Sequence, residues 1–427
     1  MITIKNLLKS QFIKNVTKII SGTLVGQLVV FLLSPVLTHL YTAEFLGVLA
    51  VFISASTTPW ALANFRLDLA IPLEEETTEA RYTAYTAIII SIVVLFLSEF
   101  LMLLVGKNFF LLLNIEELYK YKFLIPIAIF FIALYYTLQS CHIQKKEFTH
   151  NAVAKAIQNI AMIVIQVVLG YYFHTTVFLI VGYILGYLLA SGYQLYYLRL
   201  NIAELSYVIK NKLYTIKFRK HQSFAKYSTI ATVINTASIT LPSIFIAMYY
   251  NAEMVGFFAL SQSLIGLPTN MLTMAISQVF LGESSKWLQK EPDQLRQFIL
   301  KSFKTICLLA IIPTVLFYFL TPPIFNVVFG QHWSASAKIV QIMLILYISR
   351  LVTTPYSHTL NVFGYQWLQF VWDILRLTSV CVVFIVMGIQ KFDFYSTIFG
   401  YSLIMGIFYF IHIVLCLRVL KIPKIKS

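Results

Sequence analysis

The sequence predicts an all-α polytopic membrane protein with about 12 transmembrane helices in two six-helix halves. Of its 427 residues, 59% are hydrophobic and 11% are charged, and its mean hydropathy is +0.80. A soluble globule could not bury this much apolar surface. A polar, basic segment at 199–224 divides the apolar runs equally. Because six spans return a chain to its starting side, the halves are expected to insert in one orientation, as a parallel pseudo-repeat.

Apolar runs of about 20 residues, long enough to cross the hydrocarbon layer, identify the individual spans in order. In the first half they occupy 16–39, 44–65, 82–106, 121–141, 149–172 and 176–198. In the second half they occupy 225–249, 253–281, 302–321, 335–357, 366–388 and 393–417. The expected organisation is an N-terminal lobe at 1–198, a cytoplasmic linker at 199–224 and a C-terminal lobe at 225–427.

An internal duplication supports the division into halves, because the skeleton of 41–59 recurs at 250–268 without a gap. The residues that recur are Tyr41, Ala43, Glu44, Gly47, Ala50, Ser54 and Pro59, as Tyr250, Ala252, Glu253, Gly256, Ala259, Ser263 and Pro268. Each copy has a capping residue, Thr42 or Asn251, followed by a first-turn carboxylate. Pro59 and Pro268 are therefore predicted to be matching helix kinks.

The distribution of basic residues predicts the orientation. Of 32 Lys and Arg residues, 24 lie in loops or termini on one side of the predicted spans and four lie on the other. Positive charge is retained on the cytoplasmic side, so both termini and the central loop are expected there. The net charge of +15 is thus a topogenic signal, and no nucleic-acid partner is expected.

Six charged residues lie within the predicted spans and more than two residues from either end: Lys155, Lys338, Arg350, Arg376, Glu99 and Asp373. A charge at mid-bilayer costs about 2.5–3.5 kcal/mol, so each is expected to face a cavity, a partner or the interface. Lys338 lies near a helix end and can extend to the interface. Lys155 fits either extension to the interface or the lining of a cavity.

Arg350 and Asp373 lie at one depth on neighbouring spans, which predicts an ion pair between them. Arg376, one turn deeper than Asp373, is placed to share that carboxylate. Arg66 and Asp68 close the second span at the cytoplasmic surface. They form either an interfacial ion pair or the first contact for an anionic headgroup.

Motifs for catalysis or metal binding are missing from the sequence. It has no phosphate-binding glycine loop, no HExxH, no serine elbow and no metal-like spacing of its four cysteines. The sequence therefore predicts no enzyme, no cofactor and no metal site.

Four segments carry a resemblance to a known family: YTAEFLGVLAVF (41–52), RLDLAIPLEEE (66–76), VFGQHWSASA (328–337) and NVFGYQWLQFVWDILRL (361–377). They resemble the Wzx-type O-antigen flippases of polysaccharide biosynthesis, within the multidrug/oligosaccharidyl-lipid/polysaccharide exporter (MOP) superfamily. The resemblance implies a MATE-like fold in the cell inner membrane, with two six-helix lobes around a central cavity.

The same resemblance implies a substrate and an energy source. The expected partner is an oligosaccharide repeat unit on undecaprenyl diphosphate, flipped to the periplasmic leaflet by alternating access for lipopolysaccharide or related surface polysaccharide, alongside other polysaccharide assembly proteins. On the basis of their charge and position in the predicted spans, Arg66, Lys155, Arg350 and Arg376 are the candidates for a cationic cavity that would hold the diphosphate. Proton or sodium exchange is also implied, with Glu99 and Asp373 as the deeply placed carboxylates that could titrate and Asp68 as a charge partner of Arg66.

Two other classes of function remain open. A drug/cation antiporter of the same fold would need a cavity rich in carboxylates, which this sequence lacks. A membrane-embedded polysaccharide polymerase or ligase would usually carry a large external loop, and the predicted external loops are short.

Overall fold

The computed structural model describes the chain except residues 1–10, 288–291, 358, 361–362 and 420–427. The described residues form helices joined by short loops. Two compact units result, Met1–Thr240 and Leu241–Ser427. Ten helices among the described residues are long and apolar enough to cross a membrane. A shorter apolar helical segment, Val25–Leu40, is the second half of the helix Gln11–Leu40.

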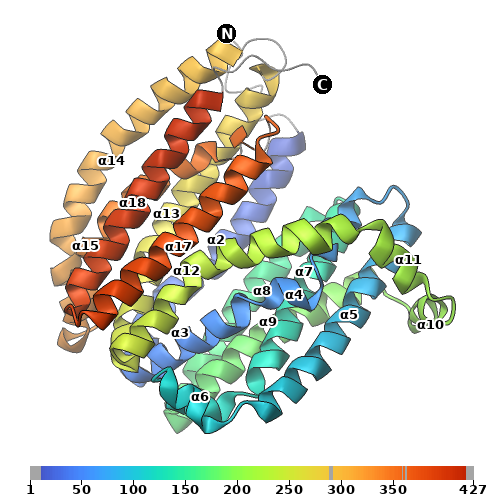
Figure 1. Cartoon of the computed structure of the whole chain (residues 1–427), viewed down its shortest axis with the longest axis horizontal. Coiled ribbons are helices and arrows are strands. Elements are labelled where there is room, and N and C mark those ends of the chain that lie inside the picture. Colours follow the sequence, from blue (N-terminus) through green and yellow to red (C-terminus); the bar gives the residue numbers. More distant parts are fainter. Residues whose placement is uncertain (1–10, 288–291, 358, 361–362, 420–427) are drawn as a thin grey trace. The chain divides into compact units, whose positions relative to one another are not determined.

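The first unit contains the helices of the first six expected spans (Figure 1). The long helices are α2 (Gln11–Leu40), α3 (Ala43–Thr57), α5 (Thr77–Leu104), α7 (Leu124–Gln144), α8 (Phe148–Phe173) and α9 (Thr176–Leu198). The short ones are α4 (Trp60–Ala63), η1 (Leu67–Leu69), η2 (Ile71–Leu73), α6 (Lys107–Leu112), η3 (Glu116–Tyr121), α10 (Ile202–Lys210), α11 (Leu213–Lys220) and η4 (Phe224–Ser228).

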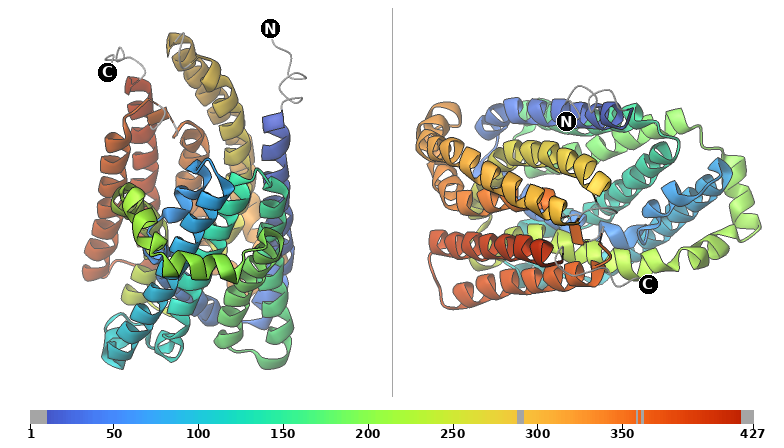
Figure 2. Two further views of the ribbon diagram at one scale, coloured as in Figure 1. Left: turned by 90° about the vertical axis from the view of Figure 1, so that its right-hand side faces the viewer. Right: turned by 90° about the horizontal axis from the view of Figure 1, so that it is seen from above.

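The second unit contains the remaining spans, whose long helices run side by side in Figure 2. They are α13 (Ala252–Trp287), α14 (Pro292–Val328), α15 (Ser334–Thr353), α17 (Gln366–Ile389) and α18 (Phe394–Val419), with η5 (Gln331–Trp333) and η6 (Thr354–Tyr356) between them. The division between the units lies inside α12 (Thr229–Tyr249). The linker expected at 199–224 stays a prediction, and its helices α10 and α11 pack against α5 of the first unit.

The duplication extends from sequence to packing. In the first unit, α5 packs on α7, α7 on α9, and α8 on α9; at equivalent positions of the second unit, α14 packs on α15, α15 on α18, and α17 on α18. The caps also correspond. The Thr42 hydroxyl accepts from the Phe45 N–H at 3.4 Å, and the Asn251 side chain accepts from the Met254 N–H at 2.8 Å. Local sequence signals therefore start the same helix in both halves.

The two duplicated prolines lie in different local structures. Helix α3 ends at Thr57 and Pro59 is the N-cap of α4, so the second span is interrupted there. Pro268 lies inside α13, which continues past it to Trp287. After the interruption, Phe65 and Arg66 both have positive φ, and this turn directs the chain into η1.

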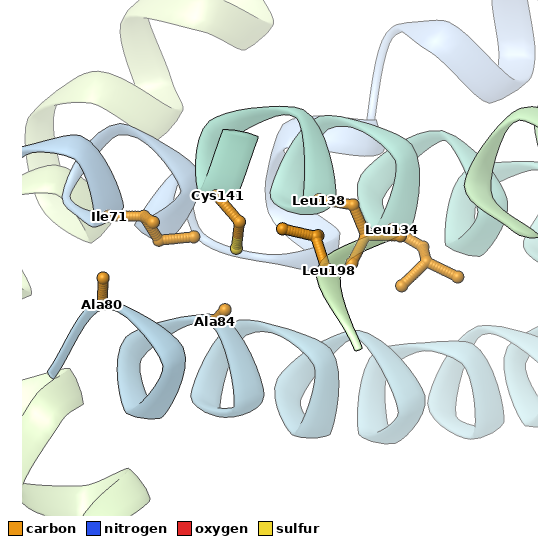
Figure 3. Close-up of a cluster of buried hydrophobic side chains, with 7 residues drawn as sticks. All are labelled: Ile71, Ala80, Ala84, Leu134, Leu138, Cys141 and Leu198. Carbon is orange, nitrogen blue, oxygen red and sulfur yellow. The ribbon is translucent and has the colours of Figure 1, made fainter. Parts of the chain in front are cut away.

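A compact apolar cluster supports that turn (Figure 3). It consists of Ile71, Ala80, Ala84, Leu134, Leu138, Cys141 and Leu198. The alanines of α5 present little bulk, so the larger side chains of α7 pack closely against them. The cluster thereby fixes the segment that follows Arg66 against α5 and α7.

Candidate functional site

Arg66 is held in an unusual backbone conformation beside Asp68. Its φ of 54° is left-handed, and its N–H donates to the Asn64 side-chain oxygen at 3.0 Å. Its guanidinium lies 3.2 Å from the Asp68 carboxylate and 4.9 Å from the centre of the Trp60 ring. Burial raises the pKa of Asp68, and Arg66 opposes that rise. The sequence-predicted pair is present, and one nearby carboxylate already balances the charge of Arg66.

Lys155 lies on α8, and its ammonium binds a neutral side chain. Its ammonium donates to the side-chain oxygen of Gln158 at 2.8 Å, one turn along the helix. A Cβ added at Gly186 of α9 would meet the Gln158 carbonyl at 2.6 Å, so this glycine lets α9 approach α8 closely at that point. No ion pair joins Lys155 to a carboxylate in the described part of the chain. Its positive charge is therefore not neutralised there.

The predicted pair between Arg350 and Asp373 does not form. Asp373 instead accepts from Arg376 on its own helix at 3.1 Å and from Gln369 at 3.2 Å. Arg350 makes no ion pair with any described carboxylate. The prediction rested on the equal depth of the two residues in their spans. Arg350 is on α15, which packs mainly against α13, α14 and α18, whereas Asp373 is on α17. Of Arg350 and Arg376, Arg350 is therefore the arginine without an ion-pair partner among the described carboxylates.

Arg376 and Asp373 belong to a buried polar network between α17 and α18. The guanidinium of Arg376 lies 4.6 Å from the centre of the Trp372 ring. Gln369 links Asp373 to His412 of α18, whose Nε2 lies 2.8 Å from the Gln369 side-chain oxygen. Sequence reasoning missed His412, although a histidine inside an apolar span was an available signal. The hydrogen bond between Gln369 and His412 therefore joins this charged pair of α17 to α18.

Glu99 lies on the C-terminal half of α5. Its neighbours Phe96, Leu97 and Phe100 are more than half exposed, as expected of a surface in contact with lipid. No described basic residue pairs with it. Lys338, by contrast, lies with its ammonium 3.8 Å from the centre of the Tyr395 ring.

A second acidic centre, also missed by sequence reasoning, lies at the start of α5. Glu74 is 7% exposed and binds Lys217, Lys220 and His221. These partners lie more than 140 residues away in the chain, so no local pattern indicated the contact. Among the described residues, no group of three or more His, Cys, Asp or Glu side chains is arranged to hold a metal ion.

Comparisons with known proteins give a family and a fold. The model of a family described as polysaccharide biosynthesis protein matches residues 36–338. The comparison with curated proteins gives no match.

Three solved structures are similar to this chain throughout. Lipid II flippase MurJ, in an inward closed conformation, has a TM-score of 0.70 at 14% identity, covering 95% of this chain and 87% of that chain. An inward-facing MATE family multidrug resistance transporter of the MOP superfamily has a TM-score of 0.67 at 12% identity, covering 97% of each. MATE multidrug transporter DinF-BH has a TM-score of 0.66 at 13% identity, covering 96% of this chain and 97% of that chain. The predicted fold class is confirmed: the chain is an all-α, multi-pass membrane protein with a MATE-like fold.

Proposed function

Because the chain belongs to the polysaccharide biosynthesis protein family, we propose that it flips an undecaprenyl-diphosphate-linked oligosaccharide repeat unit from the cytoplasmic to the periplasmic leaflet. A solved structure with the same fold is named a flippase of lipid II, which supports a lipid-linked substrate. The product would be used for O-antigen or a related surface polysaccharide. Alternating access, the usual mode of transporters built from repeats, would move it across.

The observation that carries this proposal is the state of two cations in membrane-spanning helices. Lys155 and Arg350 have no ion-pair partner among the described carboxylates, whereas Arg66 and Arg376 have Asp68 and Asp373. An uncompensated cation inside a membrane is costly, and an anionic substrate would offset that cost. A diphosphate carries the required charge. The sugar would occupy a hydrophilic interior while the polyprenyl tail stays in lipid.

The four cations then have different proposed roles. Lys155 in the first unit and Arg350 in the second are each assigned a contact with the diphosphate through charge-assisted hydrogen bonds. Arg66, with 14% of its side chain exposed, makes a first contact with the headgroup. Arg376 positions Asp373 within the network with His412, where proton or sodium exchange would act. Glu99 is the second candidate for that exchange.

The test is transport by the purified chain in proteoliposomes. A fluorescent undecaprenyl-diphosphate oligosaccharide is placed in both leaflets, and an impermeant quencher reports the fraction that changes leaflet. The chain is expected to accelerate this exchange, and Lys155→Gln or Arg350→Gln to slow it. Exchange at the rate of protein-free liposomes would overturn the proposal. In cells, deleting the gene and identifying the lipid intermediate that accumulates would define the glycan.

A drug/cation antiporter is the second candidate, and the MATE transporters among the similar structures favour it. The substrates of such an antiporter would be organic cations. Lys155 and Arg350, which have no ion-pair partner among the described carboxylates, would repel them. The same proteoliposomes separate the two functions. Gradient-driven uptake of a fluorescent cation without exchange of the lipid-linked sugar would assign the protein to this class.

A further inference from the structure

A buried carboxylate holds α11 against the first unit. Glu74 follows η2, is 7% exposed and accepts hydrogen bonds from α11 and the residue after it. Its four donors are Lys217 at 2.8 Å, Lys220 at 2.6 Å, His221 at 2.8 Å and Thr83 at 2.9 Å. Lys217 also binds Glu79 in the first turn of α5. Breaking such a buried pair is costly, so α11 is fixed in place.

A second set of contacts holds α10 against the same helix. Glu204 of α10 accepts from Arg81 at 2.8 Å and from the Tyr85 hydroxyl at 3.0 Å, both on α5. The Tyr207 ring lies 5.9 Å from the ring of Tyr82. Figure 2 (left) shows α10 running across the long helices of its unit rather than along them. The α10–α11 hairpin, residues Ile202–Lys220, is therefore a rigid attachment to the start of α5.

The length of α5 places this hairpin at headgroup depth. With 28 residues, α5 is about 42 Å long at 1.5 Å per residue, which exceeds the hydrocarbon thickness of about 30 Å. Its exposed apolar surface runs from Ile92 to Leu104. Measured back from Leu104, the hydrocarbon layer ends near Tyr85, about 20 residues away. The contacts of α10 with Arg81, Tyr82 and Tyr85 therefore lie at the boundary between hydrocarbon and headgroups.

The exposed side chains of the hairpin include both apolar residues and cations. Tyr207, Ile209 and Ile216 are 52%, 50% and 59% exposed. Lys210, Lys212 and Arg219 are also exposed, and no described carboxylate pairs with them. Glu204 is the one acidic residue of the hairpin, and it pairs with Arg81. Glu74 and Glu79 bind Lys217, while Glu75 and Glu76 are exposed in the segment before α5. The exposed charged side chains of the hairpin itself are therefore all basic, and exposed apolar side chains accompany them.

We propose that the α10–α11 hairpin is a binding surface for anionic phospholipid headgroups at the cytoplasmic membrane surface. Tyr207, Ile209 and Ile216 enter the boundary between headgroups and acyl chains, while Lys210, Lys212 and Arg219 bind lipid phosphates. Both parts are needed: the apolar side chains anchor the hairpin, and the cations select anionic over zwitterionic lipid. This binding of lipid headgroups does not depend on which substrate the protein transports.

A fluorescent probe on the hairpin tests this proposal in the full chain. The four native cysteines are replaced by alanine, Ile216→Cys is labelled with an environment-sensitive dye, and the protein is placed in phosphatidylcholine nanodiscs with or without phosphatidylglycerol. Phosphatidylglycerol is expected to shift the emission to the blue and to permit quenching by lipids spin-labelled near the headgroup. Ile209→Cys provides a second probe site if Ile216→Cys does not fold.

Charge removal supplies the specific control. Each basic residue near an anionic surface strengthens association roughly fivefold, so Lys210→Gln, Lys212→Gln and Arg219→Gln together are expected to abolish the phosphatidylglycerol-dependent shift. Lys145→Gln with Lys146→Gln, in the turn between α7 and α8, should leave it intact. Water-like emission in both kinds of nanodisc would overturn the proposal. So would a shift that appears in detergent only when cytosolic protein is added, which would assign the surface to a protein partner.

Discussion

A guanidinium beside a carboxylate presents little net charge to an approaching diphosphate, whereas an unpaired ammonium presents its full charge. This difference separates the membrane cations. Arg66 and Arg376 lie 3.2 Å and 3.1 Å from aspartates, while Lys155 has only the neutral Gln158. Substitution of Lys155 or Arg350 should therefore reduce transport, whereas substitution of Arg376 should reduce the amount of folded protein.

Lys155→Gln and Arg350→Gln should reduce transport without reducing the amount of protein. A hydrogen bond between charged groups contributes roughly 1.5–3 kcal/mol, so each change should lower apparent substrate affinity roughly 10- to 100-fold. Arg350→Lys should retain part of the activity, because it keeps the charge and loses the bidentate geometry. The measurement is leaflet exchange in proteoliposomes, with Lys338→Gln as the control. Equal activity of both glutamine variants and the wild type would remove these residues from the site.

Arg376→Gln should instead lower the amount of folded protein, because it leaves the carboxylate of Asp373 buried with only Gln369 beside it. Loss of one partner of a buried pair costs about 3–5 kcal/mol. Adding Asp373→Asn should restore membrane abundance. Abundance and surface glycan are scored separately in the double variant. A double variant that is abundant but inactive would assign Arg376 to substrate binding instead of positioning.

At the scale of elements, Glu74 joins α11 to the segment between the second and third spans. Burial raises the pKa of this carboxyl, but the hydrogen bonds from Lys217, Lys220 and His221 outweigh burial and hold the pKa well below its usual range. A lowered folded-state pKa stabilises the protein above the unfolded pKa of about 4.3. That stabilisation is lost progressively as the pH falls below it.

Glu74→Gln should destabilise the first unit by about 3 kcal/mol at pH 7, because Lys217 stays buried with one carboxylate instead of two. The difference in the free energy of unfolding between this variant and the wild type should become smaller as the pH falls from 5 to 3. Thermal unfolding in detergent at both pH values measures this, with exposed Glu75→Gln as the matched control. A constant difference across that range would show that the charge of Glu74 does not stabilise α11.

The two duplicated prolines are a second element-scale test. Pro59→Ala and Pro268→Ala should impair transport more than membrane insertion, because each proline frees a backbone carbonyl and weakens its helix locally. Pro59→Ala should have the larger effect, since Pro59 lies at an interruption between α3 and α4 and Pro268 lies within continuous α13. Transport is measured relative to membrane abundance. Wild-type glycan export by both variants would remove prolines from the mechanism.

At the scale of the whole molecule, the sequence predicted the features that depend on the length of apolar runs and on the internal duplication. Apolar run lengths located the helices, and the duplication at Tyr41 and Tyr250 anticipated the repeated packing. Contacts that depend on the rotation of a helix about its own axis could not be predicted from the sequence. Depth alone paired Arg350 with Asp373, but a one-dimensional count cannot tell which faces of two helices meet. The Glu74 clamp was missed for the related reason that only the folded chain brings α11 to α5.

The orientation in the membrane is the last prediction, and it applies to the whole chain. Because 24 of 32 basic residues lie in loops or termini on one side, cysteines at Thr42, Asn114 and Gln331 should react with an impermeant maleimide added outside intact cells. Cysteines at Thr77, Asn211 and Ser285 should react only after the membrane is permeabilised. A cysteine-free background and a permeant reagent control for accessibility. Labelling of Asn211→Cys from outside would place the α10–α11 hairpin on the periplasmic surface and reverse the proposed direction of transport.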